Sequence, residues 1–226
     1  ITLAEQEKTL QMHHEMIDRD LILARQIQAS HVPSNFTTDG IDIGIRYRPM
    51  IGLGGDFADF YRIDEERLYL VVIDVTGHGI AAALLVSRVC HEWRRAVQQA
   101  PGPGELLWQL NEFFIETFFD TPLFLTIMAV EVNLRQRRLR YAGSAHPAAL
   151  LQRNGQGFVR LDSQNAIIGF AQADKSTFHS ASLSYKPGDN LLIYTDGLVE
   201  AETTGGKILG LQGLQRIIRQ EARGST

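Results

Sequence analysis

Residues 54–60, Gly-Gly-Asp-Phe-Ala-Asp-Phe, and residues 67–79, Arg-Leu-Tyr-Leu-Val-Val-Ile-Asp-Val-Thr-Gly-His-Gly, decide the fold of this chain. The second stretch begins as an apolar strand, ends in Asp74 and turns on glycines into a helix that we expect to begin near Ile80. The first stretch carries Asp56 and Asp59 on the preceding strand or turn, after two glycines. Carboxylates and glycines are therefore predicted to gather at the ends of buried strands.

Residues 191–197, Leu-Leu-Ile-Tyr-Thr-Asp-Gly, repeat this pattern of strand, aspartate and glycine. A single Asp-Gly pair after a strand is usually only a turn. Three such carboxylates, each beside an apolar strand and with few Lys or Arg nearby, favour a binding site, because a desolvated carboxylate needs a partner. Without a cysteine–histidine cluster, the oxygen ligands indicate a hard cation: Mg²⁺, Mn²⁺ or Ca²⁺.

Three blocks, residues 53–60, 73–79 and 194–201, resemble the signature blocks of the SpoIIE-like bacterial branch of the PPM (protein phosphatase 2C-type) metal-dependent Ser/Thr phosphatases. Their order and separations agree with that family, and the resemblance runs from about Leu21 to Leu214. It implies an α+β fold in which a two-sheet antiparallel β-sandwich is flanked by helix pairs, with metals at one end of the sandwich.

Composition gives broader limits. The 226 residues are 44% hydrophobic and 21% charged, which is typical of a globular protein, and the net charge of −4 argues against a general nucleic-acid surface. The single cysteine, Cys90, excludes an internal disulfide framework and indicates a reducing, cytoplasmic location. No stretch predicts a signal peptide or membrane insertion. Because the first residue is Ile1 and not Met, we interpret the sequence as a fragment of a longer chain.

Residues 1–30 contain no proline or glycine and predict one long helix, which should end before Pro33. Leu3, Leu10 and Ile17 recur at seven-residue intervals, but the companion heptad positions are polar. Two interpretations stay open: a linker that forms a homodimer, or a surface helix packed on its own domain. The predicted domains are a helical linker over residues 1–33 and a phosphatase domain over 34–226. By the resemblance, the linker follows an upstream sensor or receiver domain.

The remaining pattern predicts runs of strands interrupted by a block of helices, which favours α+β with antiparallel sheets. Amphipathic helices are expected from Ile80 and after residues 101–104, and a closing helix over 211–221. The predicted strands cover residues 41–48, 57–63, 68–73, 123–132, 138–142, 148–152, 158–161, 178–184 and 190–194.

The resemblance implies roles for individual residues. Asp56 would bridge two Mn²⁺ or Mg²⁺ ions, Asp74 and the carbonyl of Val75 would hold one ion, and Asp196 the other. Asp59 would orient water beside the metals, as a further residue of the metal site. His78 would protonate the leaving oxygen, although the glycines around it could instead shape a turn or bind anions.

Two departures from the family pattern stand out. In residues 141–147, which are similar to an Ala-Gly-His motif, Ala145 stands where glycine is usual, and we interpret His146 as structural. The family also has a further aspartate on a later strand, and this chain has no Asp after Asp196. We therefore expect that the domain lacks its last strand and that one of the two metals binds weakly.

The predicted function is that of a metal-dependent protein Ser/Thr phosphatase in bacterial signalling. Its substrate would be a phosphoserine on an anti-sigma-factor antagonist, a STAS-type protein, as the resemblance implies. One alternative is a non-catalytic signalling or dimerisation module that retains the fold. A more remote alternative is a Ca²⁺-stabilised binding domain.

Overall fold

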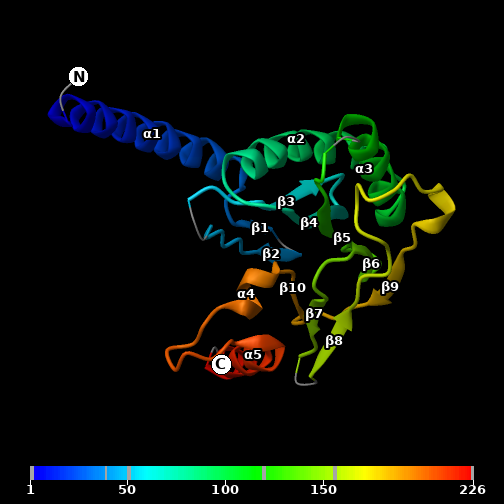
Figure 1. The fold of residues 1–226 in the computed structure, drawn as a ribbon. Helices are drawn as coiled ribbons and strands as arrows, with labels where there is room; N and C mark the ends of the chain where they lie inside the picture. Colours follow the sequence, from blue (N-terminus) through cyan, green and yellow to red (C-terminus); the bar gives the residue numbers. More distant parts are fainter. Residues whose placement is uncertain (1–2, 39, 50–51, 119–120, 155–156, 225–226) are drawn as a thin grey trace.

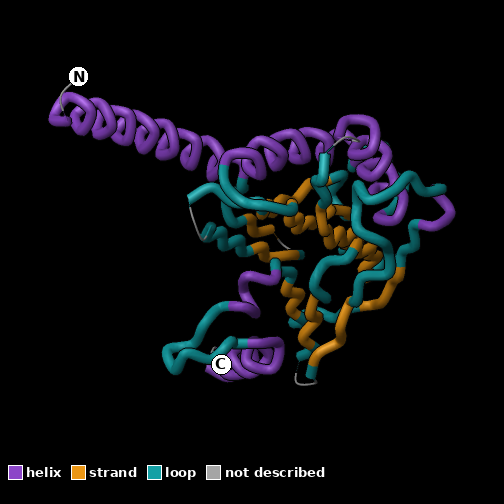
Figure 2. The backbone as a smooth tube through the Cα atoms, viewed as in Figure 1, coloured by secondary structure: helices purple, strands orange, loops and turns teal. Residues whose placement is uncertain are grey.

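The computed structural model describes residues 3–38, 40–49, 52–118, 121–154 and 157–224. It confirms the predicted α+β class with antiparallel sheets (Figures 1 and 2). The larger sheet has the strand order β3-β4-β5-β6-β9, and the smaller sheet has the order β10-β7-β8. The strands of the larger sheet are β3 (Asp56–Arg62), β4 (Arg67–Val75), β5 (Leu125–Asn133), β6 (Arg138–Ser144) and β9 (Ala181–Ser184). Those of the smaller sheet are β7 (Ala149–Gln152), β8 (Phe158–Leu161) and β10 (Asn190–Leu192).

The alternation of side chains along β4 organises the core. Tyr69, Val71 and Ile73 pack under the helices, whereas Leu68 and Leu70 face the apolar layer shared with the smaller sheet. This alternation follows from the two-residue period of a strand. Because Asp56 pairs with Asp74, and Asp59 with Val71, the first two carboxylates share one face of the sheet and Asp59 lies on the other.

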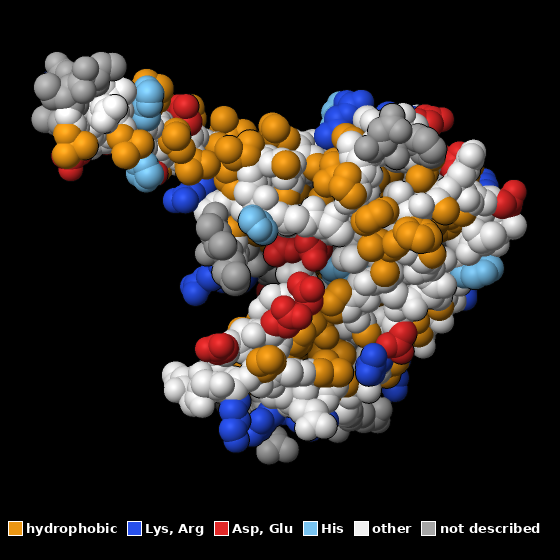
Figure 3. Space-filling model, viewed as in Figure 1, with side chains coloured by type: hydrophobic (Ala, Val, Ile, Leu, Met, Phe, Trp, Pro, Cys, Tyr) orange, Lys and Arg blue, Asp and Glu red, His pale blue; other side chains and the backbone are white. Residues whose placement is uncertain are grey.

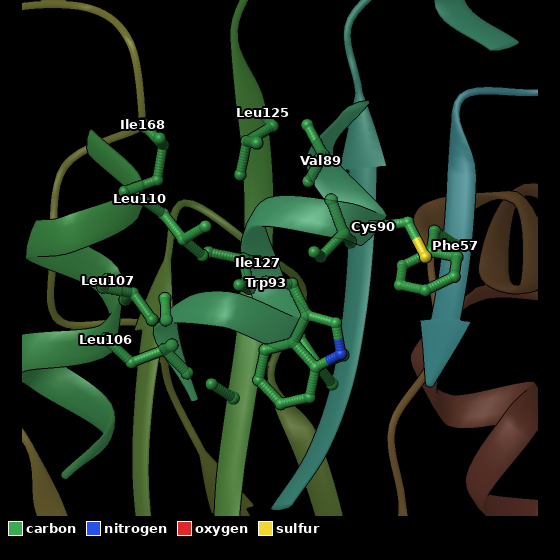
Figure 4. Packing of buried hydrophobic residues seen from close by; sticks show 14 of the residues in the cluster. Phe57, Val89, Cys90, Trp93, Leu106, Leu107, Leu110, Leu125, Ile127 and Ile168 are labelled. Carbon is green, nitrogen blue, oxygen red and sulfur yellow. The ribbon is translucent and has the colours of Figure 1, made fainter. Parts of the chain in front are cut away.

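Helix pairs cover the outer faces of the two sheets (Figure 1). Helix α2 (Ile80–Ala96) begins where the sequence predicts, and α3 (Pro103–Phe118) follows it. Their buried side chains, with Trp93 among them, interlock with the larger sheet, and the free Cys90 is part of this core (Figure 4). Helices α4 (Asp196–Glu200) and α5 (Gly210–Gly224) contribute to a third apolar cluster, which includes Leu150 and Leu214.

Helix α1 (Leu3–His31) extends from the body of the domain (Figure 1). It ends at His31, as the proline at position 33 predicts; residues 1 and 2 of the predicted helix lie outside the described residues. The heptad residues Leu3 and Ile17 are 82% and 56% exposed, so this part of the helix does not pack on its own domain. No helix in the described part of the chain is long and apolar enough to span a membrane.

Several predicted strands are shorter in the structure. The strand predicted over 190–194 ends at Leu192, and two others are shortened where side chains take the place of strand partners. The strand predicted over 41–48 is limited to β2 (Ile41–Ile43), which pairs with β1 (Phe36–Thr38), a strand not predicted. Beyond it, the Asn35 side chain accepts a hydrogen bond from the Ile45 N–H at 3.0 Å. The strand predicted from residue 178 begins only at Ala181, after the 3₁₀ turn Lys175–Thr177, and Asn165 binds the backbone of His179.

The turn after β6 holds an alanine in an unfavourable backbone conformation. Ala145 has a φ of 50°, in the left-handed region that favours glycine. We expect Ala145→Gly to raise the free energy of unfolding by about 0.5–1 kcal/mol. Glycine removes the backbone strain of the folded state, and its greater conformational entropy in the unfolded chain offsets part of that gain. Urea unfolding measures this. Ala142→Gly, within β6, is the control and should lower stability; a loss of stability in both variants would contradict the assignment of strain.

Candidate metal centre

Three segments far apart in the sequence meet at one end of the sandwich. Asp56, the first residue of β3, pairs in register with Asp74 near the end of β4. Asp196 begins α4, and the Thr195 hydroxyl just before it donates to Asp56 Oδ2 at 3.2 Å. Figure 3 shows acidic side chains gathered in a hollow between the α2 side of the molecule and α4. The structure therefore pairs Asp56 with Asp74, two of the three aspartates predicted from the strand–Asp–Gly pattern, and places the third, Asp196, next to the residue that binds Asp56.

The electrostatics of this group favour a cation. Burial, followed by the charges of Asp56 and Asp196, raises the pKa of Asp74 to about 7. Burial also raises the pKa of Asp56, an effect that its hydrogen bond from Thr195 partly offsets. Because Asp56 and Asp74 are hydrogen-bonded to each other, ionising both carboxyl groups at once is energetically unfavourable. Near neutral pH the pair therefore retains a proton, and a bound cation would take over the role of that proton.

A backbone oxygen joins the carboxylates. The Val75 N–H donates to the Gly55 carbonyl at 3.0 Å. A Cβ on Gly55 would lie 2.4 Å from the Val75 carbonyl oxygen and 3.4 Å from Asp74 Oδ1, so only glycine fits here. The Val75 carbonyl and the Asp74 carboxylate thus border the same small space beside Asp56. Carboxylate and carbonyl oxygens are the donors that Mg²⁺ and Mn²⁺ prefer, so this donor set fits a hard cation.

The described side chains do not form a complete set of metal ligands. Within the described ranges, no three His, Cys, Asp or Glu side chains converge in an arrangement that could hold an ion. Asp56 and Asp74 are hydrogen-bonded, whereas Asp196 is exposed and acts on them through its charge. The preformed part of the site is therefore two carboxylates and one carbonyl.

Asp59 lies elsewhere. Its fully buried carboxylate accepts hydrogen bonds from Trp93 Nε1 at 2.9 Å and from Arg94 Nε at 2.8 Å, on the opposite face of β3 from Asp56. The structure does not bring Asp59 to the other aspartates, which corrects its sequence-based placement beside the metals. The reason is the two-residue period of the strand, since residues 56 and 59 point to opposite faces. Asp59 instead joins β3 to α2.

We expect Asp59→Asn to lower the free energy of unfolding by about 1–3 kcal/mol, because a buried, charge-assisted pair is lost. Activity per folded molecule should stay near that of the unchanged protein. Denaturant unfolding and assays corrected for the folded fraction measure the two effects. Asp64→Asn is the matched control: it removes an Asp–Arg pair on the surface and should cost less than about 1 kcal/mol. Equal losses in the two variants would contradict the assigned role.

His78 is exposed in the turn between β4 and α2. Gly77 and Gly79 on either side have φ values of 96° and 80°. Both glycines thus adopt the left-handed backbone that this turn requires, which agrees with their predicted turn-shaping role. The part of His78 as an acid stays a prediction.

His146 is linked to the carboxylates through Thr126. It is 4% exposed, and its Nδ1 is 2.7 Å from the Thr126 hydroxyl; Thr126 pairs in register with Asp74. Burial lowers the pKa of the imidazole to about 4, so the ring is neutral at physiological pH. These contacts agree with the predicted structural role.

Sequence reasoning missed two contacts that support the site. The first is the hydrogen bond from the Thr195 hydroxyl to Asp56. The second is Gln28 of α1, whose side chain binds Gly54, two residues before Asp56. A polar residue in a helix gives no signal by itself, but Thr195 directly precedes an Asp-Gly pair and could have been noticed.

Known proteins share this architecture. The phosphoserine phosphatase RsbP of Bacillus subtilis (strain 168) is 30% identical over 185 residues, which are 80% of this chain and 45% of RsbP. The SiaA-PP2C domain of Pseudomonas aeruginosa is 21% identical, with a TM-score of 0.78 over 93% of this chain and 85% of that one. A crystal structure of RsbX in complex with magnesium is 15% identical, with a TM-score of 0.54 over 82% of this chain and 84% of that one.

This chain spans less than half the length of RsbP. The structural likenesses, at these identities, show the fold. The family model described as stage II sporulation protein E (SpoIIE) matches residues 64–226, which is more than half of the sequence. On this evidence the chain belongs to the SpoIIE family, a branch of the PPM phosphatases.

Proposed function

We propose that this chain is a metal-dependent protein phosphatase that hydrolyses phosphoserine. The observation that carries the proposal is the pairing of Asp56 with Asp74 beside the Val75 carbonyl, in a group whose negative charge, increased by the nearby Asp196, favours binding of a cation. RsbP, the relative at 30% identity, is a phosphoserine phosphatase, which supports the same reaction class here.

The residues would divide the work as follows. Asp56, Asp74 and the Val75 carbonyl would hold one Mn²⁺ or Mg²⁺ tightly, and Asp196 would contribute to a second, weaker site. Such ions supply charge neutralisation for the phosphoryl group and activate water at neutral pH. Thr195 would keep Asp56 oriented through its hydrogen bond. His78, exposed in the turn between β4 and α2, would donate a proton to the leaving serine oxygen.

The setting that we propose is bacterial signalling in the cytoplasm. The substrate would be a phosphoserine on a STAS-type anti-sigma-factor antagonist. Residues 1–33 would form a linker from an upstream sensor or receiver domain, and residues 34–226 would contain the phosphatase domain. Support comes from the helix that extends from the body and from the reaction of RsbP.

Hydrolysis of p-nitrophenyl phosphate and of phosphoserine peptides, with and without Mn²⁺, tests the proposal. We expect turnover that requires Mn²⁺ and stops with chelator. The alternative, a non-catalytic dimerisation module, is favoured by the exposed apolar residues of α1. A folded protein that binds partners but gives no Mn²⁺-dependent turnover would support that alternative.

The heptad residues of α1 give a separate prediction. If Leu10 and Ile17, which are 66% and 56% exposed, form a seam between two copies, Leu10→Glu and Ile17→Glu should convert a dimer into a monomer. Analytical ultracentrifugation measures the mass. Met12→Glu, at an exposed position outside the seven-residue repeat, is the matched control and should leave the dimer intact. An unchanged mass in the seam variants would rule out this interface.

A further inference from the structure

The last turns of α1 are attached to the loop that leads into Asp56. Gln28 is 4% exposed and is the one buried residue among the described side chains of this helix. Its Nε2 donates to the Gly54 carbonyl at 2.6 Å, and its Oε1 accepts from the Gly54 N–H at 3.1 Å. One amide side chain thus satisfies both backbone groups of Gly54, as a neighbouring strand would in a sheet.

A second contact strengthens this attachment. Arg25 lies three residues before Gln28, on the same side of the helix. A Cβ on Gly52 would be 2.1 Å from Arg25 Nε, so the Arg25 side chain rests directly against this loop. The loop from Gly52 to Gly54 is therefore in contact with α1 at two points.

The other end of the loop is held by β4. Gly55 accepts a hydrogen bond from the Val75 N–H and sits against the Val75 carbonyl oxygen, with no room for a side chain. Gly54 and Gly55 are thus fixed from two directions, by α1 and by β4, and Asp56 follows at once. The backbone that carries Asp56 has its position set partly by a helix outside the sandwich.

We propose that Gln28 is a positioning residue through which the place of α1 sets the position of Asp56, and thereby the affinity of the carboxylate group for its cation. The proposal rests on the proposed function in treating this group as a cation site. Gln28 acts through Gly54. If α1 is displaced, the Gly54 N–H and carbonyl lose their partners, the loop relaxes, and Asp56 is no longer held opposite Asp74. Most of α1 extends from the body of the domain, whereas its last turns carry the contact with Gly54 (Figure 1).

Two substitutions test the contact. Gln28→Met keeps the length of the side chain and removes both hydrogen bonds, whereas Gln28→Glu keeps an acceptor for the Gly54 N–H and loses the donor to the carbonyl. Gln26→Met, at an exposed position on the same helix, is the matched control. Free Mn²⁺ in each titration is measured by electron paramagnetic resonance, and hydrogen exchange at Gly54 and Gly55 is measured in the metal-free proteins.

We expect Gln28→Met to weaken Mn²⁺ binding about tenfold, within the range seen when residues that orient metal ligands are lost. Exchange at Gly54 and Gly55 should rise by a similar factor, Gln28→Glu should be intermediate, and Gln26→Met should match the unchanged protein.

A folded Gln28→Met with a lower melting temperature but unchanged affinity and exchange would overturn the proposal, because Gln28 would then be only an anchor for the helix. If Gln28→Met does not fold, Gln28→Glu decides by the same measurements. Failure of the unchanged protein to bind Mn²⁺ would refute the proposed function, and the exchange data would still decide the role of Gln28.

Discussion

Replacing Asp74 by Asn is expected to reduce Mn²⁺-dependent hydrolysis of p-nitrophenyl phosphate by at least about a hundredfold, more than the loss of a residue that only orients a ligand. Asn has the shape of Asp but lacks the charge that a hard cation needs. Asp196→Asn should also abolish most activity, because it removes the carboxylate contributed by α4. Initial rates over a range of Mn²⁺ concentrations measure both effects.

The fold should survive the Asp74 substitution. With its pKa raised to about 7, Asp74 is largely protonated in the metal-free protein at slightly acid pH, and Asn imitates that neutral form. Metal-free Asp74→Asn should therefore be at least as stable as the unchanged protein. A loss of activity in this variant can then be attributed to the missing charge and not to unfolding. Asp162→Asn, which changes an exposed carboxylate paired with Arg160, is the control and should keep full activity. Activity within a few-fold of the unchanged protein in either site variant would remove that residue from the metal centre.

The fold was predictable where local pattern and tertiary packing agree. The apolar run of β4, the turn on Gly77 and Gly79, and the start of α2 at Ile80 all lie where the sequence places them. Helix α2 has a continuous apolar face, and the helix pair buries that face on the larger sheet. Strand ends were less predictable, because Asn35 and Asn165 replace backbone partners through side-chain contacts that have no sequence period.

The site was predictable in part, for a similar reason. Asp56, Asp74 and Asp196 each follow a recognisable strand–glycine pattern, and antiparallel pairing brings the first two together. Asp59 lies away from the other aspartates because its separation of three residues from Asp56 is odd, which puts the two side chains on opposite faces of a strand. Gln28 could not have been found from local sequence, since its importance depends on a contact with Gly54 across 26 positions of the chain.

Proton release on metal binding is the second large effect that the structure predicts. The pKa of Asp74 is raised from 3.8 to about 7, so the folded protein holds a proton there that the unfolded chain gives up near pH 4. A raised pKa contributes stability at low pH, and that contribution is lost as the pH rises through the folded value. The metal-free protein should therefore become less stable between about pH 4 and pH 7, the range that separates the unfolded from the folded pKa. Thermal unfolding measures this loss, and saturating Mn²⁺ should prevent it.

The same proton competes with the cation. Below pH 7, each unit of acidification should weaken Mn²⁺ binding by up to about tenfold, and between pH 8.5 and pH 5.5 the affinity should fall on the order of thirtyfold. Calorimetry in buffers of different ionisation enthalpy should show close to one proton released per ion at pH 6 and close to none above pH 8. Asp162→Asn should keep this profile. A flat affinity over that range, with no proton released at pH 6, would mean that the cation does not replace a proton on the Asp56–Asp74 pair, because a carboxyl group with a pKa near 7 must ionise before it can bind a hard cation.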